Sequence, residues 1–168
     1  HVIESFFEVG VFYIEAIQNQ GGNISPAGTT AVQKGGSRTY TITVNEGHEL
    51  TNLLIDGQPV GIPSGNTYTF TNVNANHTIE PLFGQQTFTI NASAEGSGYI
   101  VESGAIQVVY GNNKTFRFTA DEGWEPTVLK VDGLEVPVPA NNEYTFDNVT
   151  ANHTIHITFT KKKFTITV

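Results

Sequence analysis

The sequence matches itself at an offset of 76 residues, and this internal repeat limits the possible folds more than any other feature. Residues 11–86 align with residues 87–162 without a gap, and roughly two in five aligned positions are identical. The match is densest where Y-T-F-T-N-V-N-A-N-H-T-I, residues 68–79, lies over Y-T-F-D-N-V-T-A-N-H-T-I, residues 144–155. The sequence therefore predicts two copies of one module, repeat module 1 at 11–86 and repeat module 2 at 87–162.

The same register assigns both ends of the sequence. Residues 1–7 align with 77–83, and residues 163–168 align with 87–92. We therefore expect residues 1–10 to hold the last strand of a preceding repeat and residues 163–168 to hold the first strand of a following one. Strands cut off from their own sheets expose unpaired N–H and C=O groups. These segments are expected to dock on the neighbouring repeat of the same chain or to pair head to tail between molecules.

Short stretches of alternating apolar and polar residues predict an all-β fold. Examples are F-T-I-N-A at 88–92, T-Y-T-I-T-V at 39–44 and T-F-R-F-T-A at 115–120, and such alternation marks a strand with one buried face. No window of eleven residues carries a convincing helical period. We expect two tandem small antiparallel β modules of about 76 residues each, flanked by the partial repeats.

Two Asp-Gly pairs, Asp56-Gly57 and Asp132-Gly133, lie between short apolar runs at equivalent positions of the two copies. A two-residue hairpin turn needs positive φ angles, and Asp-Gly adopts them readily. The sequence predicts a tight hairpin turn at each pair.

The predicted core consists of positions that are apolar in both copies. In the first copy these positions are Phe12, Ile14, Ile24, Val32, Tyr40, Ile42, Leu53, Ile55, Val60, Phe70, Val73, Ile79 and Phe83. Each has an apolar counterpart in the second copy, such as Phe116 for Tyr40 and Val136 for Val60.

Composition excludes several classes of partner. The formal net charge is −8 and the basic residues form no block apart from Lys161, Lys162 and Lys163, so nucleic acid and anionic membranes are poor partners. The chain has no cysteine, which excludes both a disulfide framework and a thiolate site. No apolar run approaches the roughly 18 residues of a membrane-spanning helix, so no membrane insertion is expected.

The histidines of the repeated A-N-H-T-I frame, His77 and His153, are the best candidates for chemistry, together with His1 in the same register. A zinc site needs several converging ligands. Each copy offers one such histidine, with no cysteine and no second histidine that recurs in both copies. A structural role therefore explains the frame better than a metal site.

We interpret the frame as a structural turn motif. Asn72 and Asn76 can fold back on the backbone in Asx turns. Val73 and Ala75 can turn inward, which leaves His77 to hydrogen-bond across the loop. The corresponding residues of the second copy include Asn148, Asn152 and His153.

Three carboxylates recur in both copies. They are Glu46, Glu49 and Asp56, with Glu122, Glu125 and Asp132 at the equivalent positions. Such groups could form a glycosidase-type acid/base pair or a calcium site, but calcium usually takes a dense local run of Asp and Asn, and no Asp-x-Asp-x-Asp-Gly run occurs. Ser, His and Asp likewise show no recurring arrangement for nucleophilic catalysis. We expect no catalytic, cofactor-binding or metal-binding residue. We interpret Asp56 and Asp132 primarily as residues of the hairpin turns.

Trp124, Tyr99 and Tyr110 are possible ligand contacts, because an exposed aromatic ring offers an apolar face to a sugar. Trp124 takes the place of His48 of the first copy. The alternative for Trp124 is a partly buried, structural role.

The order of the motifs resembles the divergent internalin-type B-repeat family. The resemblance rests on G-G-N-I-S-P-A-G at 21–28, an E-G-aromatic strand end at 46–48, an apolar run into Asp-Gly at 53–57 and the motif at 68–79. The second copy carries the same features at 96–104, 122–124, 129–133 and 144–155. It has Val101 and Glu102 in place of Ser-Pro, and the first copy has His48 at the aromatic position.

The resemblance implies a tandem module of bacterial secreted or cell-surface proteins, used as a spacer, stalk or adhesion region. The family carries no catalytic residues to transfer. We expect a non-enzymatic, extracellular region whose partners are the neighbouring repeats and a host or glycan ligand. The alternative is a carbohydrate- or ligand-binding accessory region of a secreted enzyme.

Overall fold

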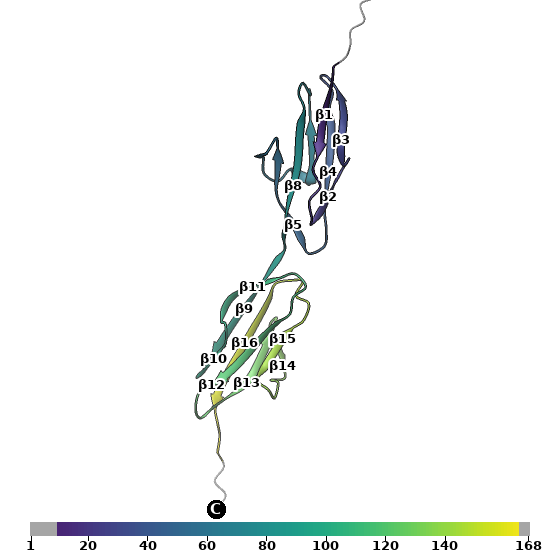
Figure 1. Cartoon of the computed structure of the whole chain (residues 1–168). Helices are drawn as coiled ribbons and strands as arrows, with labels where there is room; N and C mark the ends of the chain where they lie inside the picture. Colours follow the sequence, from purple (N-terminus) through teal and green to yellow (C-terminus); the bar gives the residue numbers. More distant parts are fainter. Residues whose placement is uncertain (1–9, 165–168) are drawn as a thin grey trace, which may run out of the picture. The chain divides into compact units, whose positions relative to one another are not determined.

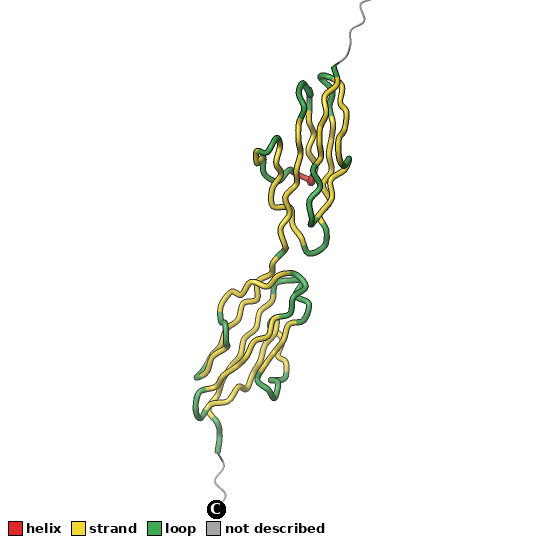
Figure 2. Tube along the Cα trace, in the orientation of Figure 1, coloured by secondary structure: helices red, strands yellow, loops and turns green. Residues whose placement is uncertain are grey.

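The computed structural model describes residues 10–164, which divide into two compact units between Gln85 and Gln86. We call the part before this boundary unit 1 and the part after it unit 2 (Figure 1). Figure 2 shows strands and loops almost throughout, and the described helical part is a single 3-10 turn at Ser64–Asn66. No helix in the described residues is long and apolar enough to cross a membrane. The prediction of tandem all-β modules is confirmed.

Most of the two terminal segments, 1–10 and 163–168, lies outside the described residues. Lys163 and Phe164 are described, and neither belongs to a strand. The carbonyl of Gly10 accepts a hydrogen bond from the Lys34 N–H at 2.7 Å. Docking or head-to-tail pairing through terminal strands stays a prediction.

Unit 1 contains, within the described residues, a five-stranded and a three-stranded sheet. The larger sheet has the order β3, β1, β8, β5, β6, with bounds Gly28–Gln33, Val11–Ala16, His77–Gln85, His48–Ile55 and Gln58–Pro59. The smaller sheet has the order β2, β4, β7, with bounds Gly22–Ser25, Arg38–Val44 and Thr67–Phe70.

Unit 2 has the same strand order in both of its sheets. The larger sheet runs β11, β9, β16, β13, β14, with bounds Gly104–Val109, Thr87–Glu95, His153–Lys161, Trp124–Val131 and Leu134–Val136. The smaller sheet runs β10, β12, β15, with bounds Gly98–Ile100, Lys114–Ala120 and Glu143–Phe146. The register of the central pair shifts at the same place in each unit, between Leu50 and Asn52 and between Pro126 and Val128.

One strand pair in each larger sheet departs from the antiparallel pairing that we expected. In unit 1, β1 pairs parallel with β8, with Ile14 opposite His77. In unit 2, β9 pairs parallel with β16, with Ile90 opposite His153. Parallel neighbours need a long crossover, and the smaller sheet supplies it, because its strands lie between the first and last strands in chain order.

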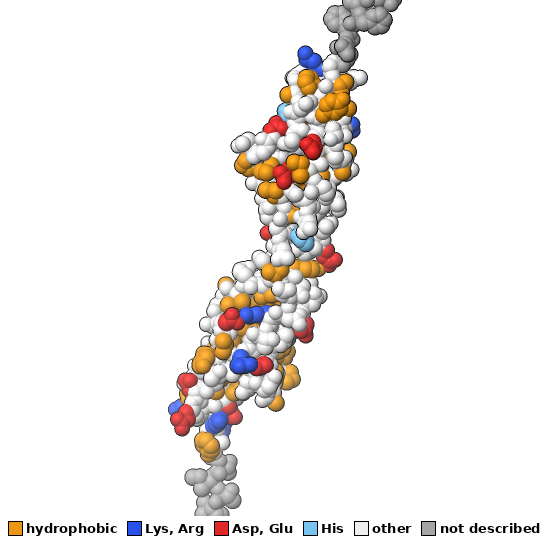
Figure 3. All heavy atoms as spheres, in the orientation of Figure 1, with side chains coloured by type: hydrophobic (Ala, Val, Ile, Leu, Met, Phe, Trp, Pro, Cys, Tyr) orange, Lys and Arg blue, Asp and Glu red, His pale blue; other side chains and the backbone are white. Residues whose placement is uncertain are grey.

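The core of each unit lies between its two sheets and gives a sandwich-like arrangement. Along β4, Tyr40 and Ile42 are buried whereas Thr39 and Thr41 are exposed, so one face of the smaller sheet meets the larger one. Uncharged side chains and backbone cover most of the visible surface of both units in Figure 3, with charged groups scattered among them. Alternation in the sequence thus maps onto the inner and outer faces of the sheets.

The predicted core residues are buried or pack against the core while partly buried, and Val60 is the exception. Its side chain is 49% exposed, whereas its counterpart Val136 packs against the core of unit 2. Val60 follows the two-residue strand β6 and precedes Gly61 at a φ of 80°, so the chain turns away from the sheet there. Ala16 and Leu50 are buried although we did not predict them as core residues.

A glycine on the smaller sheet of each unit lies beneath an aromatic ring from the larger sheet. A Cβ atom on Gly98 would lie 2.8 Å from two ring atoms of Phe159. A Cβ atom on Gly22 would collide with the ring of Phe83 and lie 2.5 Å from the carbonyl oxygen of Thr43. The two sheets approach closely at these points only because the backbone carries no side chain there.

Tyr40 and its counterpart Phe116 occupy the same place in the two cores. Each ring meets its neighbour edge to face, Tyr40 with Phe70 and Phe116 with Phe146, with ring centroids 6.0 Å apart in both cases. The hydroxyl of Tyr40 is buried and has no hydrogen-bond partner among the described residues. A buried polar group without a partner costs stability.

Replacing Tyr40 by Phe is therefore expected to stabilise unit 1 by about 1 kcal/mol, because the orphan hydroxyl is removed and the ring contacts remain. Denaturant unfolding of the variant and the parent chain measures the change. The reverse substitution in unit 2, Phe116→Tyr, is the matched control and should lower stability. A Tyr40→Phe variant that is less stable than the parent would contradict this account of the core.

Candidate functional site

The turn between β5 and β6 is formed by the first Asp-Gly pair. Asp56 has a φ of 52° and Gly57 a φ of 76°, and the equivalent Asp132 and Gly133 have φ of 50° and 79°. Both central residues thus have the positive φ angles of a tight hairpin turn. The turn directs the aspartate side chain toward the start of β8, because the Asp56 N–H donates to the carbonyl of Thr78 at 3.1 Å.

Both carboxylate oxygens of Asp56 accept hydrogen bonds from the first residues of β8. Oδ1 accepts from the Thr78 N–H at 2.8 Å, and Oδ2 lies 2.7 Å from Nδ1 of His77. An ionised carboxylate can only accept, so the His77 ring donates from Nδ1. In unit 2, Asp132 makes the same two contacts, to Thr154 and His153, both at 2.8 Å.

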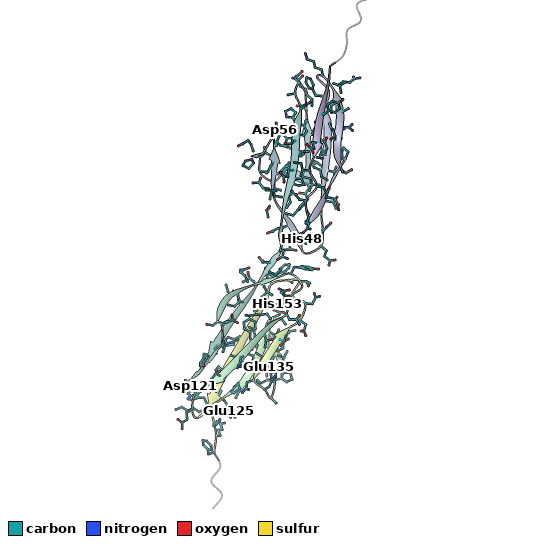
Figure 4. All side chains as sticks on the ribbon, in the orientation of Figure 1. His48, Asp56, Asp121, Glu125, Glu135 and His153 are labelled. Carbon is teal, nitrogen blue, oxygen red and sulfur yellow. The ribbon has the colours of Figure 1, made fainter. Side chains whose placement is uncertain are left out.

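The histidine ring links this turn to the other sheet. His77 stacks on Phe70, the last residue of β7, with ring centroids 5.1 Å apart. His153 lies against Phe146 with a tilted ring and a centroid distance of 4.8 Å. Phe70 and Phe146 are buried in their cores. We call the set Asp56, Phe70, His77 and Thr78, and its equivalent Asp132, Phe146, His153 and Thr154, the Asp–His clasp. Asp56 and His153 are labelled in Figure 4.

The clasp lowers the pKa of its aspartate. Partial burial by itself would raise the pKa of Asp56, but the hydrogen bonds from His77 and Thr78 and the electrostatic interaction with His77 outweigh it. For Asp132 burial again opposes the shift, and the hydrogen bonds from Thr154 and His153 keep the pKa below its ordinary value. Each carboxylate is thus held in its charged form.

The asparagine before each histidine anchors the first strand of the unit. Oδ1 of Asn76 accepts the Tyr13 N–H at 2.9 Å, and Oδ1 of Asn152 accepts the Thr89 N–H at 2.8 Å. The local Asx turn that we expected at Asn76 is therefore replaced by a contact to a distant strand. Ala75 is exposed and does not turn inward as expected.

The first asparagine of the motif marks a left-handed turn. Asn72 has a φ of 52° and Asn148 a φ of 48°. The following Val73 is 2% exposed; its N–H donates to Gly36 at 2.9 Å and its carbonyl accepts from Gly35 at 2.7 Å. The motif therefore closes the end of the core against the loop before β4.

A hollow of about 250 Å³ lies beside the clasp of unit 1. Tyr13, Glu15 and Thr29 line it together with Asp56 and His77. The aligned residues of unit 2 are Thr89, Asn91 and Ala105. The clasp is thus present in both units, whereas these three residues beside it differ.

The recurring carboxylates do not gather into one site. Glu46 precedes β5 and Asp56 follows it, so the strand His48–Ile55 separates them by on the order of 25 Å. Within residues 10–164, no group of three or more His, Cys, Asp or Glu side chains is placed to hold a metal ion. His1, the third candidate histidine, lies outside the described residues.

Two of the three candidate aromatic residues lie at one end of unit 2. Trp124 lines a hollow of about 600 Å³ with Thr119, Asp121 and other residues, and Tyr99 lies opposite Thr119 in the smaller sheet. Tyr110 donates its N–H to the carbonyl of Gln86, which immediately precedes β9. The length of β9 separates this end of the unit from the other end by on the order of 30 Å. In Figure 4, Asp121 and Glu125 mark the Trp124 end of the unit, and His153 lies toward the other end.

A polar cluster on the outer face of unit 2 was not predicted from the sequence. Ser93 Oγ lies 2.9 Å from Nδ1 of His156, and Nε2 of His156 lies 3.7 Å from Glu95. Ser93 and His156 are partners in the parallel pair, which no local pattern could indicate. In unit 1 the aligned positions hold Ile17, Asn19 and Glu80, with an Asn19–Glu80 hydrogen bond of 2.9 Å instead.

No family model, curated protein or solved structure matches the chain. The functional argument therefore rests on its own residues.

The lowered aspartate pKa makes the clasp acid-sensitive. Its contribution to stability is fully present above the ordinary Asp pKa and is lost as the pH falls below about 4 toward the lower folded-state pKa. Replacing Asp56 by Asn should destabilise unit 1 by about 1 kcal/mol at neutral pH. The stability difference between variant and parent should shrink on acidification, which unfolding curves at a series of pH values measure. A difference that stays constant into strong acid would contradict the assignment.

Proposed function

We propose that this chain is a non-enzymatic tandem repeat region of a bacterial secreted or cell-surface protein that acts as a spacer, stalk or adhesion module. The observation that carries the proposal is the difference between the clasp and its surroundings. Asp, His, Thr and Phe of the clasp occur in both units with nearly the same distances. The neighbouring positions 13, 15 and 29 hold different residues in the second unit, Thr89, Asn91 and Ala105.

A reactive site and a structural contact place different demands on a sequence. A catalytic His–Asp pair works on a substrate with further groups placed around it, such as a nucleophile and an oxyanion stabiliser. A structural pair needs only the partners that it holds together. The clasp connects a turn, the start of β8 and the end of β7, and these contacts recur while the hollow beside it changes. This pattern supports a folding role.

The connection between the units also supports a repeat region. β8 ends at Gln85 and β9 begins at Thr87, so Gln86 alone separates the last strand of unit 1 from the first strand of unit 2. A one-residue connection is sufficient in a chain that consists of successive repeats. The resemblance to internalin-type B repeats and the extracellular location that it implies belong to this proposal, with neighbouring repeats as the first partners.

The spacer role is tested by display on a bacterial surface. An epitope is placed beyond one unit, residues 11–86, beyond two units, or beyond a Gly/Ser linker with as many residues as two units. Binding of a bulky antibody should increase from one unit to two and should exceed that of the flexible linker, which has a compact average length. Equal binding in all three cases would contradict a spacer function.

The hollow beside Trp124 favours a second candidate, carbohydrate binding. Trp124 offers an indole ring, and Asp121 and Glu125 offer carboxylates in the same hollow. Lys161 places its ammonium group 5.8 Å from the centre of the indole ring. An aromatic face beside hydrogen-bonding groups is suited to a sugar ring. In this reading the chain is an accessory region of a secreted enzyme.

A glycan array probed with the chain tests the second candidate. Binding that is abolished by Trp124→Ala and retained in Tyr110→Ala, which changes an aromatic residue at the other end of the unit, would support it. Tyr99→Ala should weaken binding to a smaller extent, because Tyr99 lies beside the hollow and does not line it. An array without binding, or equal loss in all three variants, would count against a sugar site at Trp124.

A further inference from the structure

Asp-Gly pairs carry an intrinsic chemical liability. The backbone nitrogen of the glycine can attack Cγ of the aspartate, because no side chain on the glycine hinders the approach. A new C–N bond forms, a C–O bond breaks and water leaves, which gives a cyclic succinimide. Water then opens the ring at either carbonyl and yields aspartate or isoaspartate. The reaction needs no other reagent, and it proceeds best when the carboxyl group is protonated and free to rotate.

We propose that Asp56-Gly57 and Asp132-Gly133 are latent sites of succinimide and isoaspartate formation, and that the Asp–His clasp keeps them unreacted in the folded chain. Both oxygens of each carboxylate are bound, one by a backbone N–H at 2.8 Å and one by a histidine ring at 2.7 or 2.8 Å. The donors belong to β8 and β16, not to the turn. The carboxylate must release both before its Cγ can reach the glycine nitrogen.

The charge of the clasp acts in the same direction as its geometry. The contacts hold each carboxylate in its ionised form. Succinimide formation is slower from this form, because the carboxylate oxygen is a poorer leaving group than the hydroxyl of a protonated carboxyl group. The side chains of Asp56 and Asp132 are 48% and 45% exposed, so burial does not shield them from water. Protection therefore depends on the specific hydrogen bonds.

The position of the two turns makes protection necessary. An isoaspartate routes the backbone through the side chain and adds one methylene to the turn. In unit 1 the turn sets Ile55 opposite Gln58, and in unit 2 it sets Val131 opposite Leu134. A longer turn cannot keep this two-residue register. Reaction at the turn would also remove the carboxylate that holds the histidine.

The test uses His77→Phe in the whole chain, since a phenylalanine keeps a ring on Phe70 and removes the donor to Asp56. After prolonged incubation at mildly acidic pH, cleavage after glutamate at bonds not followed by proline separates residues 50–95, which contain Asp56, from residues 123–135, which contain Asp132. Isoaspartate is then measured in each peptide by enzymatic methylation. We expect about a tenfold faster rise at Asp56, the factor that corresponds to about 1.4 kcal/mol. The rate of isoaspartate formation at Asp132 in the same molecule should not change.

Two controls separate the clasp from general unfolding. His153→Phe should give the opposite result, with faster isomerisation at Asp132 and an unchanged rate at Asp56. Ile42→Val weakens the core of unit 1 on β4 and leaves the clasp residues untouched. If Ile42→Val accelerates reaction at Asp56 as much as His77→Phe does, protection comes from global folding and the proposal is wrong. It is also overturned if His77→Phe leaves the rate at Asp56 unchanged.

Discussion

The rest of each unit depends on the pairing of its last strand with two neighbouring strands. β8 pairs with β1 on one side and with β5 on the other, so it joins the β1–β3 and β5–β6 pairs into one five-stranded sheet. Its first residue, His77, holds the β5–β6 turn and stacks on the smaller sheet. Without β8 the larger sheet would separate into two pairs of strands, and an isolated two-stranded pair is marginally stable at best. β16 has the same role in unit 2.

Features with a local physical cause could be predicted from the sequence, and those that depend on distant partners could not. The alternation around Tyr40 and the positive φ of Asp56 follow from residues next to one another. The parallel pairing of β1 with β8 and the bond from Tyr13 to Asn76 join residues 63 apart, and no local pattern encodes them. The exposure of Val60 also escaped prediction, because its counterpart Val136 is packed and both look apolar in the sequence.

Comparing the two units separates what folding requires from what each unit carries on its surface. The clasp, the anchoring asparagine and the glycine beneath the aromatic ring occur in both. The Ser93–His156 contact and the Trp124 hollow occur in unit 2, where unit 1 has Ile17, Glu80 and His48 at the aligned positions. The surface features that differ between the units are thus carried on a frame that both units share.

The parallel pairing of first and last strands has a mechanical consequence. Tension along the chain enters a unit at the beginning of β1 and leaves at the end of β8, which are opposite ends of two parallel neighbours. Pulling therefore loads the two strands in shear. Their hydrogen bonds bear the force together and do not break one after another. The parallel register extends from Ile14 to Ala16 in unit 1 and from Ile90 to Glu95 in unit 2. Unit 2 thus has the longer parallel register to bear such a load.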